Sequence, residues 1–454
     1  MIECMVAAPQ SGSGKTVMTC ALLAALKYKG LDPCAFKCGP DYIDPMFHRA
    51  VLGVPSCNLD LFLAPEQTVR ALFARRAAGH GTAVCEGVMG YYDGLGGVTD
   101  RASAWHLADT LCLPVLLVLR PKGASLTLAA QVRGLRDFRP DSHLAGILLN
   151  ECSPMLYRTL APMLERETGL PVLGYLPSMP EARFESRHLG LYTAAEIGDL
   201  TARMERLGQQ ACRTLDLEEI AAHCRRPARH MPDEEKTSPV RAQIAVARDE
   251  AFCFCYDETL DALRRAGADC IFFSPLHDGG LPQGCGGLYL PGGYPELYAE
   301  ALARNKAMRA AVRAAVEKKM PTVAECGGFL YLGQTLEDRA GCAWPMAGVL
   351  PGRGVRTEKL VRFGYAELTA HADGLLFRAG ERVPVHEFHY WDSTCNGTAC
   401  TAEKPVGARR WECGFSTPAL FASFAHLYWA GAPQMTARFV QAATEYGKEQ
   451  GNDV

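Results

Sequence analysis

The sequence predicts an α/β protein made of two doubly wound domains, each with a mostly parallel sheet. Short apolar runs without polar alternation recur along the chain, helical patterns separate them, and a polar, proline-containing segment divides them into two sets. Such runs are typical of strands in parallel sheets that helices cover on both faces. At 454 residues the chain is also long enough for two domains of roughly 200 residues each.

The first half contains five apolar runs that we expect to form strands. They are bounded by Gly, Pro, Asp or Asn and lie at Ile2–Ala7, Thr82–Cys85, Pro114–Leu119, Leu144–Leu149 and Pro171–Gly174. Between the first two runs, Lys15–Lys29 has a helical pattern with leucines on one side, and Gly30 ends it. We therefore expect residues 1–196 to form the first α/β domain.

A change in composition marks the predicted domain boundary. Residues 197–239 are polar and charged and end in the stretch Pro232–Pro239, so we expect a helical segment followed by an exposed linker. A second α/β alternation occupies 240–454. Its first predicted elements are a strand at Gln243–Arg248, a helix at Asp257–Ala266, and strands at Asp269–Phe273 and Leu288–Leu290.

The composition argues against several classes of partner. Hydrophobic residues make up 48% and charged residues 21%, as in globular proteins with large cores. The net charge of -3 provides no basic surface for nucleic acid or anionic membranes. We recognise neither a signal peptide nor an apolar stretch near the roughly 18 residues of a membrane span, and we expect a cytoplasmic protein. The 19 cysteines lack zinc-site spacing, so most should be buried thiols.

A glycine-rich loop follows the first predicted strand. The stretch Pro9–Thr16 ends in the G-K-T of a P-loop, although Pro9 stands where the first glycine is usual. Its glycines let backbone N–H groups surround an anion, and the following helix adds a partial positive charge. Lys15 would reach the β- and γ-phosphates of a nucleotide. The predicted nucleotide-binding residues of this loop are Gly12, Ser13, Gly14, Lys15 and Thr16.

Acidic residues gather where the predicted strands end. Asp41 and Asp44 follow a short apolar run, Glu86 ends another run, and Asp93 lies in the loop after it. The carboxyl ends of the strands in a doubly wound sheet face the ligand crevice. We therefore predict that these four carboxylates organise a metal ion, a nucleotide or a substrate.

Two more specific predictions follow from the same edge of the sheet. Oxygen ligands suit Mg²⁺, so Thr16, Asp41 and Glu86 are the predicted metal-binding residues. Asn150 ends the run that contains Leu149, and we expect it to contact the adenine of the nucleotide. For any one of the acids alone, a solvated loop position is the simpler interpretation.

A second candidate centre lies in the other half of the chain. The stretch Pro321–Leu330 has the pattern strand, sharp turn, helix, with Cys326 at the turn. Such a turn exposes a nucleophile, and the start of a helix should lower the pKa of the thiol. The N–H groups of Gly327 and of Gly293, which lies in a second glycine-containing loop, would stabilise an oxyanion. Alone, Cys326 would be better explained as a buried structural thiol.

A nucleophilic thiol needs a base, and three histidines are candidates. His426 ends an apolar run and is the best placed, whereas His386 and His389 are alternatives.

Four sequence blocks carry a resemblance to a known family. They read K-x-G-P-D-Y-x-D-P, E-G-V-M-G-x-Y-D, L-P-G-G-Y-P-E and C-G-G, in this order after the phosphate loop. This pattern resembles cobyrinic acid a,c-diamide synthases over nearly the whole chain. The resemblance implies a first domain similar to dethiobiotin synthetase and a second domain similar to class I glutamine amidotransferases.

The resemblance also implies a chemistry. Cys326 would attack glutamine with His426 as the proton acceptor, and the ammonia would pass to a ring carboxylate phosphorylated by ATP. Asp41, Asp44, Glu86 and Asp93 would organise the metal, the nucleotide and the corrin carboxylate. The implied cofactor is Mg²⁺ with ATP as co-substrate, the implied partners are cobyrinate or a related corrinoid, L-glutamine and ATP, and a homodimer is compatible with the sequence.

The chain departs from class I amidotransferases at one point, and other functions remain open. Those proteins usually carry His-x-Glu, whereas His426 is followed by Leu427 and Tyr428, so an incomplete triad is expected. Hydrogenobyrinic acid or nickel sirohydrochlorin would use the same chemistry. A partitioning-type P-loop ATPase is a distant alternative, because it would need a lysine where Gln10 stands. A binding module that has lost catalysis is a third.

Overall fold

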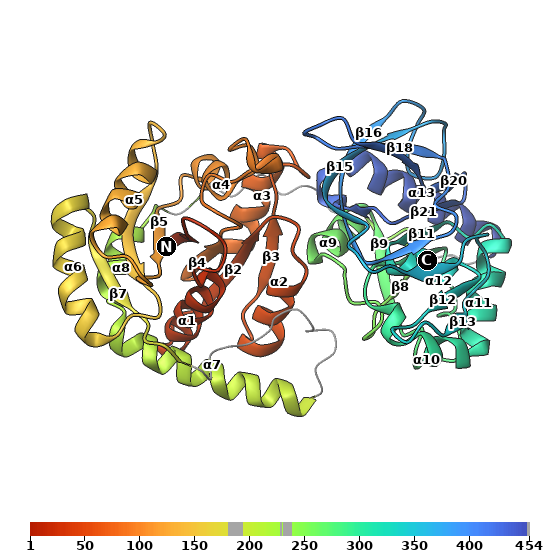
Figure 1. Cartoon of the computed structure of the whole chain (residues 1–454). Coiled ribbons are helices and arrows are strands. Elements are labelled where there is room, and N and C mark those ends of the chain that lie inside the picture. The colour runs from red at the N-terminus through yellow and green to blue at the C-terminus, as the bar shows by residue number, and fades with distance from the viewer. Residues whose placement is uncertain (180–193, 228, 230–237, 452–454) are drawn as a thin grey trace. The chain divides into compact units, whose positions relative to one another are not determined.

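The chain forms two compact units, Met1–Glu234 and Glu235–Val454. The structure is a computed structural model that describes residues 1–179, 194–227, 229 and 238–451 (Figure 1). The division between the units falls inside the predicted segment 197–239, and most of the predicted linker lies outside the described residues. Along the described residues, no helix combines the length and the apolar character that a membrane crossing requires.

The first unit is built on a parallel sheet of seven strands in the order β3-β2-β4-β1-β5-β6-β7. The strands are β1 (Ile2–Ala7), β2 (Pro33–Cys38), β3 (Ser56–Leu59), β4 (Thr82–Glu86), β5 (Val115–Leu119), β6 (Leu144–Leu149) and β7 (Val172–Tyr175). The predicted parallel α/β fold is confirmed. The strands β2 and β3 extend the sheet beyond the predicted ones.

Helices cover both faces of this sheet. Along β5, Leu116 and Val118 belong to the core that includes α1 and α7, while Leu117 and Leu119 belong to the core that includes α5 and α6. Successive side chains of a strand point to opposite faces, so a strand without polar residues needs cover on both. The helices are α1 (Lys15–Tyr28), α2 (Ile43–Phe47), α3 (Glu66–Ala77), α4 (Ala104–Leu111), α5 (Leu126–Asp137), α6 (Pro154–Thr168), α7 (Ala194–Thr214) and α8 (Leu217–Cys224).

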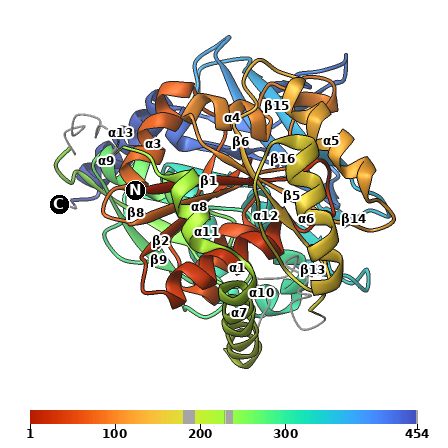
Figure 2. The same ribbon diagram turned by 90° about the vertical axis from the view of Figure 1, so that its left-hand side faces the viewer.

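The two helices that follow residue 193 belong to the first unit. One face of α7 buries Leu200, Met204 and Leu207 in the core beneath α1, at the spacing of an amphipathic helix. A Cβ added to Gly208 would lie 2.7 Å from Cβ of Ala24, so glycine lets the two helices approach closely. Figure 2 shows α7 beside α1. The helical part of the predicted segment 197–239 therefore packs as part of the first unit.

The second unit also contains a mostly parallel sheet, in the order β20-β21-β11-β10-β8-β9. Only the β20–β21 pair of this sheet is antiparallel. Its strands are β8 (Ala242–Ala247), β9 (Ala268–Phe273), β10 (Gly287–Leu290), β11 (Thr322–Glu325), β20 (Phe415–Thr417) and β21 (Leu420–Ser423). The second predicted α/β fold is confirmed as well.

Two further sheets, which we did not predict, complete the second unit. A four-stranded sheet has the order β13-β12-β14-β17, and an antiparallel five-stranded sheet has the order β19-β18-β15-β16-β22. Their strands are β12 (Thr335–Glu337), β13 (Ala343–Pro345), β14 (Gly354–Arg356), β15 (Arg362–Ala370), β16 (Arg382–His389), β17 (Trp391–Ser393), β18 (Cys400–Glu403), β19 (Arg410–Cys413) and β22 (His426–Leu427). Most are too short to give a clear alternating pattern.

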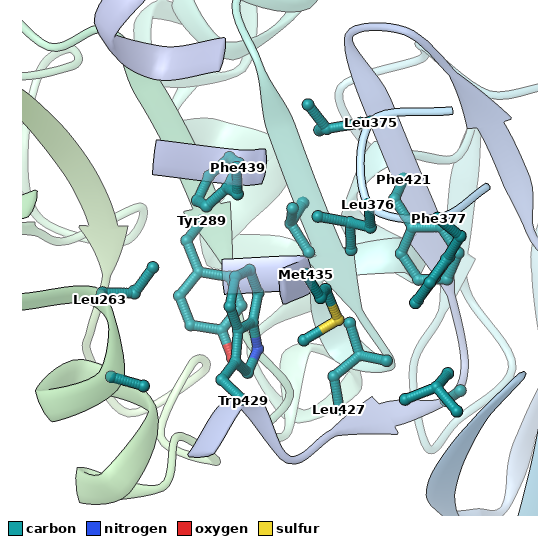
Figure 3. Close-up of a cluster of buried hydrophobic side chains, with 14 of the residues drawn as sticks. Leu263, Tyr289, Leu375, Leu376, Phe377, Phe421, Leu427, Trp429, Met435 and Phe439 are labelled. Atoms are coloured by element: carbon teal, nitrogen blue, oxygen red, sulfur yellow. The ribbon is translucent and has the colours of Figure 1, made fainter. Parts of the chain in front are cut away.

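The core of the second unit brings the parallel sheet and the five-stranded sheet together. Tyr289 of β10 and Phe421 of β21 pack with Trp429, Met435 and Phe439, as Figure 3 shows. The other face of the parallel sheet is covered by α10 to α12. The helices of this unit are α9 (Asp257–Arg265), α10 (Ala299–Arg304), α11 (Lys306–Glu317), α12 (Gly327–Leu332) and α13 (Pro433–Glu449).

Candidate active sites

The predicted phosphate loop connects β1 to α1 in the first unit. Gly12 and Gly14 have φ values of 80° and 93°, a backbone conformation that favours glycine. A Cβ at Gly14 would lie 1.9 Å from Nδ2 of Asn150, and this amide donates to the carbonyl of Ser13 over 3.1 Å. Asn150 thus braces the loop from the end of β6. A small hollow beside Asn150, lined also by Val17, is compatible with its predicted adenine contact.

The side chains of Lys15 and Thr16 in this loop both make hydrogen bonds to neighbouring residues. The Lys15 ammonium donates to the carbonyl of Met89 and lies 3.5 Å from the carbonyl of Gln10. Burial and the nearby Lys37 lower the pKa of Lys15. The Thr16 hydroxyl donates to Oε1 of Glu86 over 2.6 Å. The loop therefore meets the carboxyl end of β4, as the parallel sheet requires.

Lys37 joins two of the predicted acids in a buried ion-pair network. Its ammonium contacts Oδ2 of Asp44 and lies 2.8 Å from Oε1 of Glu86. Burial opposes the charge of Lys37, yet Glu86 and Asp44 raise its pKa well above the ordinary value. Burial would raise the pKa of Asp44 too, but Lys37 lowers it overall. For Glu86 burial prevails over Lys37 and raises the pKa to about 7.

The other two predicted acids shape the surrounding loops. Oδ1 of Asp41 accepts hydrogen bonds from the N–H groups of Ile43, over 2.7 Å, and of Asp44. Burial and the neighbouring Asp44 raise the pKa of Asp41. Oδ2 of Asp93 accepts from the N–H of Gly90 over 2.9 Å. Asp41 therefore adjoins the Lys37 network, whereas Asp93 orders the loop that carries Met89.

Two of the predicted metal-binding residues, Thr16 and Glu86, lie together at the end of β4. Oε2 of Glu86 is buried and has no hydrogen-bond partner among the described residues, and the Thr16 hydroxyl lies on the other oxygen of the same carboxyl group. The described part of the chain holds no cluster of three or more His, Cys, Asp or Glu side chains suited to a metal. One or two protein ligands are usual for Mg²⁺ that also binds substrate phosphates. Thr16 and Glu86 therefore fit the ion, and the role of Asp41 stays a prediction.

Sequence reasoning missed two members of this centre. Lys37 lies in the K-x-G-P-D block, and its position before two acids was a usable signal. His48 is fully buried, with Nδ1 3.0 Å from the Ser56 hydroxyl and Nε2 4.0 Å from Oε2 of Glu86. Burial lowers the pKa of His48 to about 4, so the imidazole is neutral. The sequence carries no signal for His48.

Cys326 occupies the sharp turn between β11 and α12. Its φ of 48° and ψ of -100° are strained for a residue with a side chain. The backbone N–H of Cys326 donates to the carbonyl of Ser423 over 2.8 Å, which fixes the turn against β21. Strand, strained turn and helix thus follow each other as predicted, and the thiol is buried with 6% exposure.

The loop after β10 lies against both the cysteine turn and a histidine. A Cβ at Gly327 would lie 3.0 Å from the N atom of Gly293, so these two predicted oxyanion donors are adjacent. A Cβ at Gly292 would lie 2.5 Å from Cε1 of His426. The glycines of this loop therefore bring the turn with Cys326 and the imidazole of His426 to one place.

Of the three candidate bases, His426 is the one that contacts the glycine loop. His386 is its cross-strand partner on β16, with ring centroids 6.5 Å apart. His389 stacks on Phe424 with ring centroids 3.9 Å apart, and its Nδ1 lies 2.6 Å from the carbonyl of Trp391. We therefore keep His426 as the predicted base.

The pKa values of Cys326 and His426 define their charge before substrate binds, and that of Cys326 differs from the expectation. Burial and the carboxylates of Glu296 and Glu387 raise the pKa of Cys326, although the N–H of Gly327 opposes them. The expected lowering of this pKa by the helix start is therefore wrong, because burial outweighs a helix of only six residues. Burial, His386 and His389 lower the pKa of His426 to about 3. Both groups are uncharged before substrate binds.

Comparison with known families matches both units. Residues 4–191 match the CobQ/CobB/MinD/ParA nucleotide binding domain, and residues 243–434 match the CobB/CobQ-like glutamine amidotransferase domain. A solved structure of PurLQS from Thermotoga maritima covers 46% of this chain and 99% of its own at 16% identity, but its TM-score of 0.34 is too low to support an argument. The fold and the two domains define an enzyme of the glutamine amidotransferase ligase class.

Curated relatives match the chain over nearly its full length. Cobyrinate a,c-diamide synthases from Salmonella typhimurium, Caldanaerobacter subterraneus and Priestia megaterium are 39%, 36% and 35% identical to it. The alignments cover 97% to 99% of this chain and of each relative. The chain belongs to the cobyrinate a,c-diamide synthase family and is a carbon–nitrogen ligase of cobalamin biosynthesis.

Proposed function

We propose that this enzyme converts the a- and c-acetate carboxylates of cobyrinic acid into carboxamides, using ATP and ammonia released from glutamine. The observation that supports this division of labour most strongly is that each unit has its own reaction centre. The phosphate loop meets Lys37 and Glu86 in the first unit, and Cys326 meets a glycine loop in the second. The substrate is taken from the relatives that align with the whole chain.

In the second unit, Cys326 is the nucleophile and His426 the base. The Sγ–H bond breaks as its proton passes to His426, and sulfur bonds to the side-chain carbonyl carbon of glutamine. The N–H groups of Gly293 and Gly327 stabilise the oxyanion of the tetrahedral intermediate. His426 then returns the proton to the leaving nitrogen, which departs as ammonia. Water hydrolyses the thioester, giving glutamate and free Cys326.

In the first unit, an acetate oxygen of the corrin ring attacks the γ-phosphorus of ATP. ADP leaves, and an acyl phosphate forms. Ammonia then attacks the carbonyl carbon, and phosphate departs with the oxygen of the former carboxylate. The N–H groups of the phosphate loop and the ammonium of Lys15 hold the phosphates, and Asn150 keeps the loop in shape while bordering the adenine site.

The carboxylates of the first unit divide the remaining tasks. Thr16, Glu86 and Asp41 would hold Mg²⁺, which neutralises negative charge on the phosphates when it is bound. Lys37 holds Glu86 and Asp44 together, so these groups keep a fixed geometry. Asp93 fixes the loop that approaches Lys15.

The direct test is product formation by the full chain. Incubation with ATP, Mg²⁺, glutamine and cobyrinic acid should give a corrinoid in which two hydroxyl groups are replaced by amino groups, as seen by mass spectrometry. Carboxylates labelled with ¹⁸O should transfer one labelled oxygen to phosphate for each amide formed. Amidation of only hydrogenobyrinic acid or nickel sirohydrochlorin would correct the substrate, and amidation of none of the three would refute the proposal.

A further inference from the structure

We infer that Glu325, the residue before the nucleophile, positions the imidazole of His426 and stabilises it when it is protonated. Class I amidotransferases usually supply this carboxylate two residues after the histidine, where this chain has Tyr428. The inference rests on the proposed roles of Cys326 and His426 in glutamine hydrolysis. It assigns the third member of the triad to a different strand.

Strand pairing brings Glu325 to the histidine. β11 and β21 are parallel neighbours in which Glu325 pairs with Ser423, and the chain then turns to place His426 at the start of β22. Oε2 of Glu325 accepts a hydrogen bond from the N–H of Leu427 over 3.3 Å. The same oxygen lies 4.0 Å from Nδ1 of His426. The side chains of Glu325 and His426 are both almost fully buried, so solvent does not surround either of them.

The other oxygen of this carboxyl group is held rigidly. Oε1 of Glu325 accepts from the indole N–H of Trp429 over 3.0 Å and from the Tyr289 hydroxyl over 3.2 Å. These two rings pack edge to face with centroids 5.4 Å apart, and Figure 3 shows them side by side in the core. Buried aromatic groups with one polar end are well suited to fix a buried acceptor. Glu325 is therefore a preorganised group.

The charges around His426 explain what the carboxylate does. The groups that face the imidazole are His386 and His389 of β16, which disfavour its protonation, and Glu325 of β11 at 4.0 Å, whose carboxylate favours it when ionised. Glu325 would form an ion pair with His426 once the imidazole is protonated, and its hydrogen bonds come from uncharged donors. With a proton on Nδ1 directed at Glu325, Nε2 is left to accept the thiol proton.

The test compares Glu325→Gln with wild type in the full chain. Glutamine keeps the shape and an acceptor oxygen but not the charge. We expect kcat for glutamine hydrolysis to fall on the order of 100-fold or more, with little change in KM or in ammonia-dependent synthesis. Burial raises the pKa of Glu325 to about 8, so wild-type kcat should rise with pH through that range. The variant should lose this rise.

Two further variants separate positioning from folding. Glu258→Gln neutralises another fully buried glutamate of the same unit, on α9, and should keep the wild-type pH profile. Glu325→Asp retains the charge and should recover part of the activity and of the pH dependence.

The outcomes distinguish this inference from the proposed function. A lower melting temperature for Glu325→Gln with an unchanged pH profile would mean that Glu325 only supports the fold, and the inference would be wrong. Full activity of Glu325→Gln beside an inactive Cys326→Ala variant would also refute it alone. Glutamine hydrolysis by Cys326→Ala would instead overturn the proposed function.

Discussion

The two candidate reaction centres differ in how they handle charge. In the first unit, Lys37 forms ion pairs with Asp44 and Glu86, and a further lysine lies in the phosphate loop. In the second unit, Cys326 and His426 are uncharged at rest, and neutral donors surround Glu325. The first centre is charged before substrate arrives, whereas the second becomes charged only during reaction.

This difference matches the chemistry that each centre is proposed to perform. Phosphoryl transfer brings permanent negative charge, which fixed cations and dipoles stabilise without reorganisation. Thiol attack on an amide starts from neutral groups and creates charge by moving one proton. A buried, water-poor site strengthens the interaction between the resulting ions. The comparison predicts that substitutions in the two units affect separate partial reactions, with different costs for folding.

The largest expected effect comes from Cys326→Ala. Glutamine-dependent synthesis should fall by at least about 10³-fold, because the proposed nucleophile is gone. Synthesis with added ammonium salts should remain near wild type, since the charged centre is intact. Both rates can be measured by ADP release and product mass. Loss of the ammonium-dependent rate would contradict the proposal that each unit carries out its own partial reaction.

Lys15→Ala is the complementary change in the first unit. It should reduce synthesis with either nitrogen source on the order of 10²- to 10³-fold, because the β- and γ-phosphates lose their cation. Glutamine hydrolysis measured by glutamate release should persist. If ammonium-dependent synthesis survived, the phosphate-loop assignment would be incorrect.

Lys37→Met tests how the buried charges of the first unit affect its stability. It leaves two buried carboxylates without their cation, so the free energy of unfolding of the first unit should fall by about 3–5 kcal/mol. Adding Asp44→Asn and Glu86→Gln should restore part of this loss, because the unpaired charges are then gone. Urea unfolding of the three proteins measures the coupling. Equal free energies of unfolding for all three proteins would show that the buried charges of the network do not affect stability.

The smallest effect concerns pH and the second unit. The pKa of Glu325 is raised by burial from 4.5 to about 8, so the folded state keeps a proton that the unfolded chain loses. The contribution of Glu325 to stability therefore declines as pH rises from about 4.5 to about 8. The melting temperature of Glu325→Gln should decline less steeply over this pH range than that of the wild type. A parallel decline in the two proteins would contradict this assignment of the raised pKa.

Local signals in the sequence predicted much of the fold and of both centres. The strand at Ile2–Ala7, the glycines of the phosphate loop and the turn at Cys326 depend on neighbours in sequence, and all were found. The position of Glu86 at a strand end also followed from local pattern. Parallel pairing then places such strand ends at one edge of the sheet.

Interactions between distant segments were beyond sequence reasoning. The proximity of Glu325 to His426 depends on the register of β11 with β21 and on the turn that follows β21. The neutral state of Cys326 depends on burial by several elements, which the local strand–turn–helix pattern does not reveal. His48 lies near Glu86 only because η1 (His48–Leu52) packs beneath the sheet.

The contact between Gly292 and the His426 ring also constrains how the enzyme can change over time. A single added methyl group at position 292 would occupy the space of the imidazole, since its carbon would lie 2.5 Å from Cε1. Such a mutation should impair the proposed hydrolysis of glutamine while sparing the ATP-dependent step proposed for the first unit. Position 292 is therefore restricted to glycine for as long as the enzyme depends on His426.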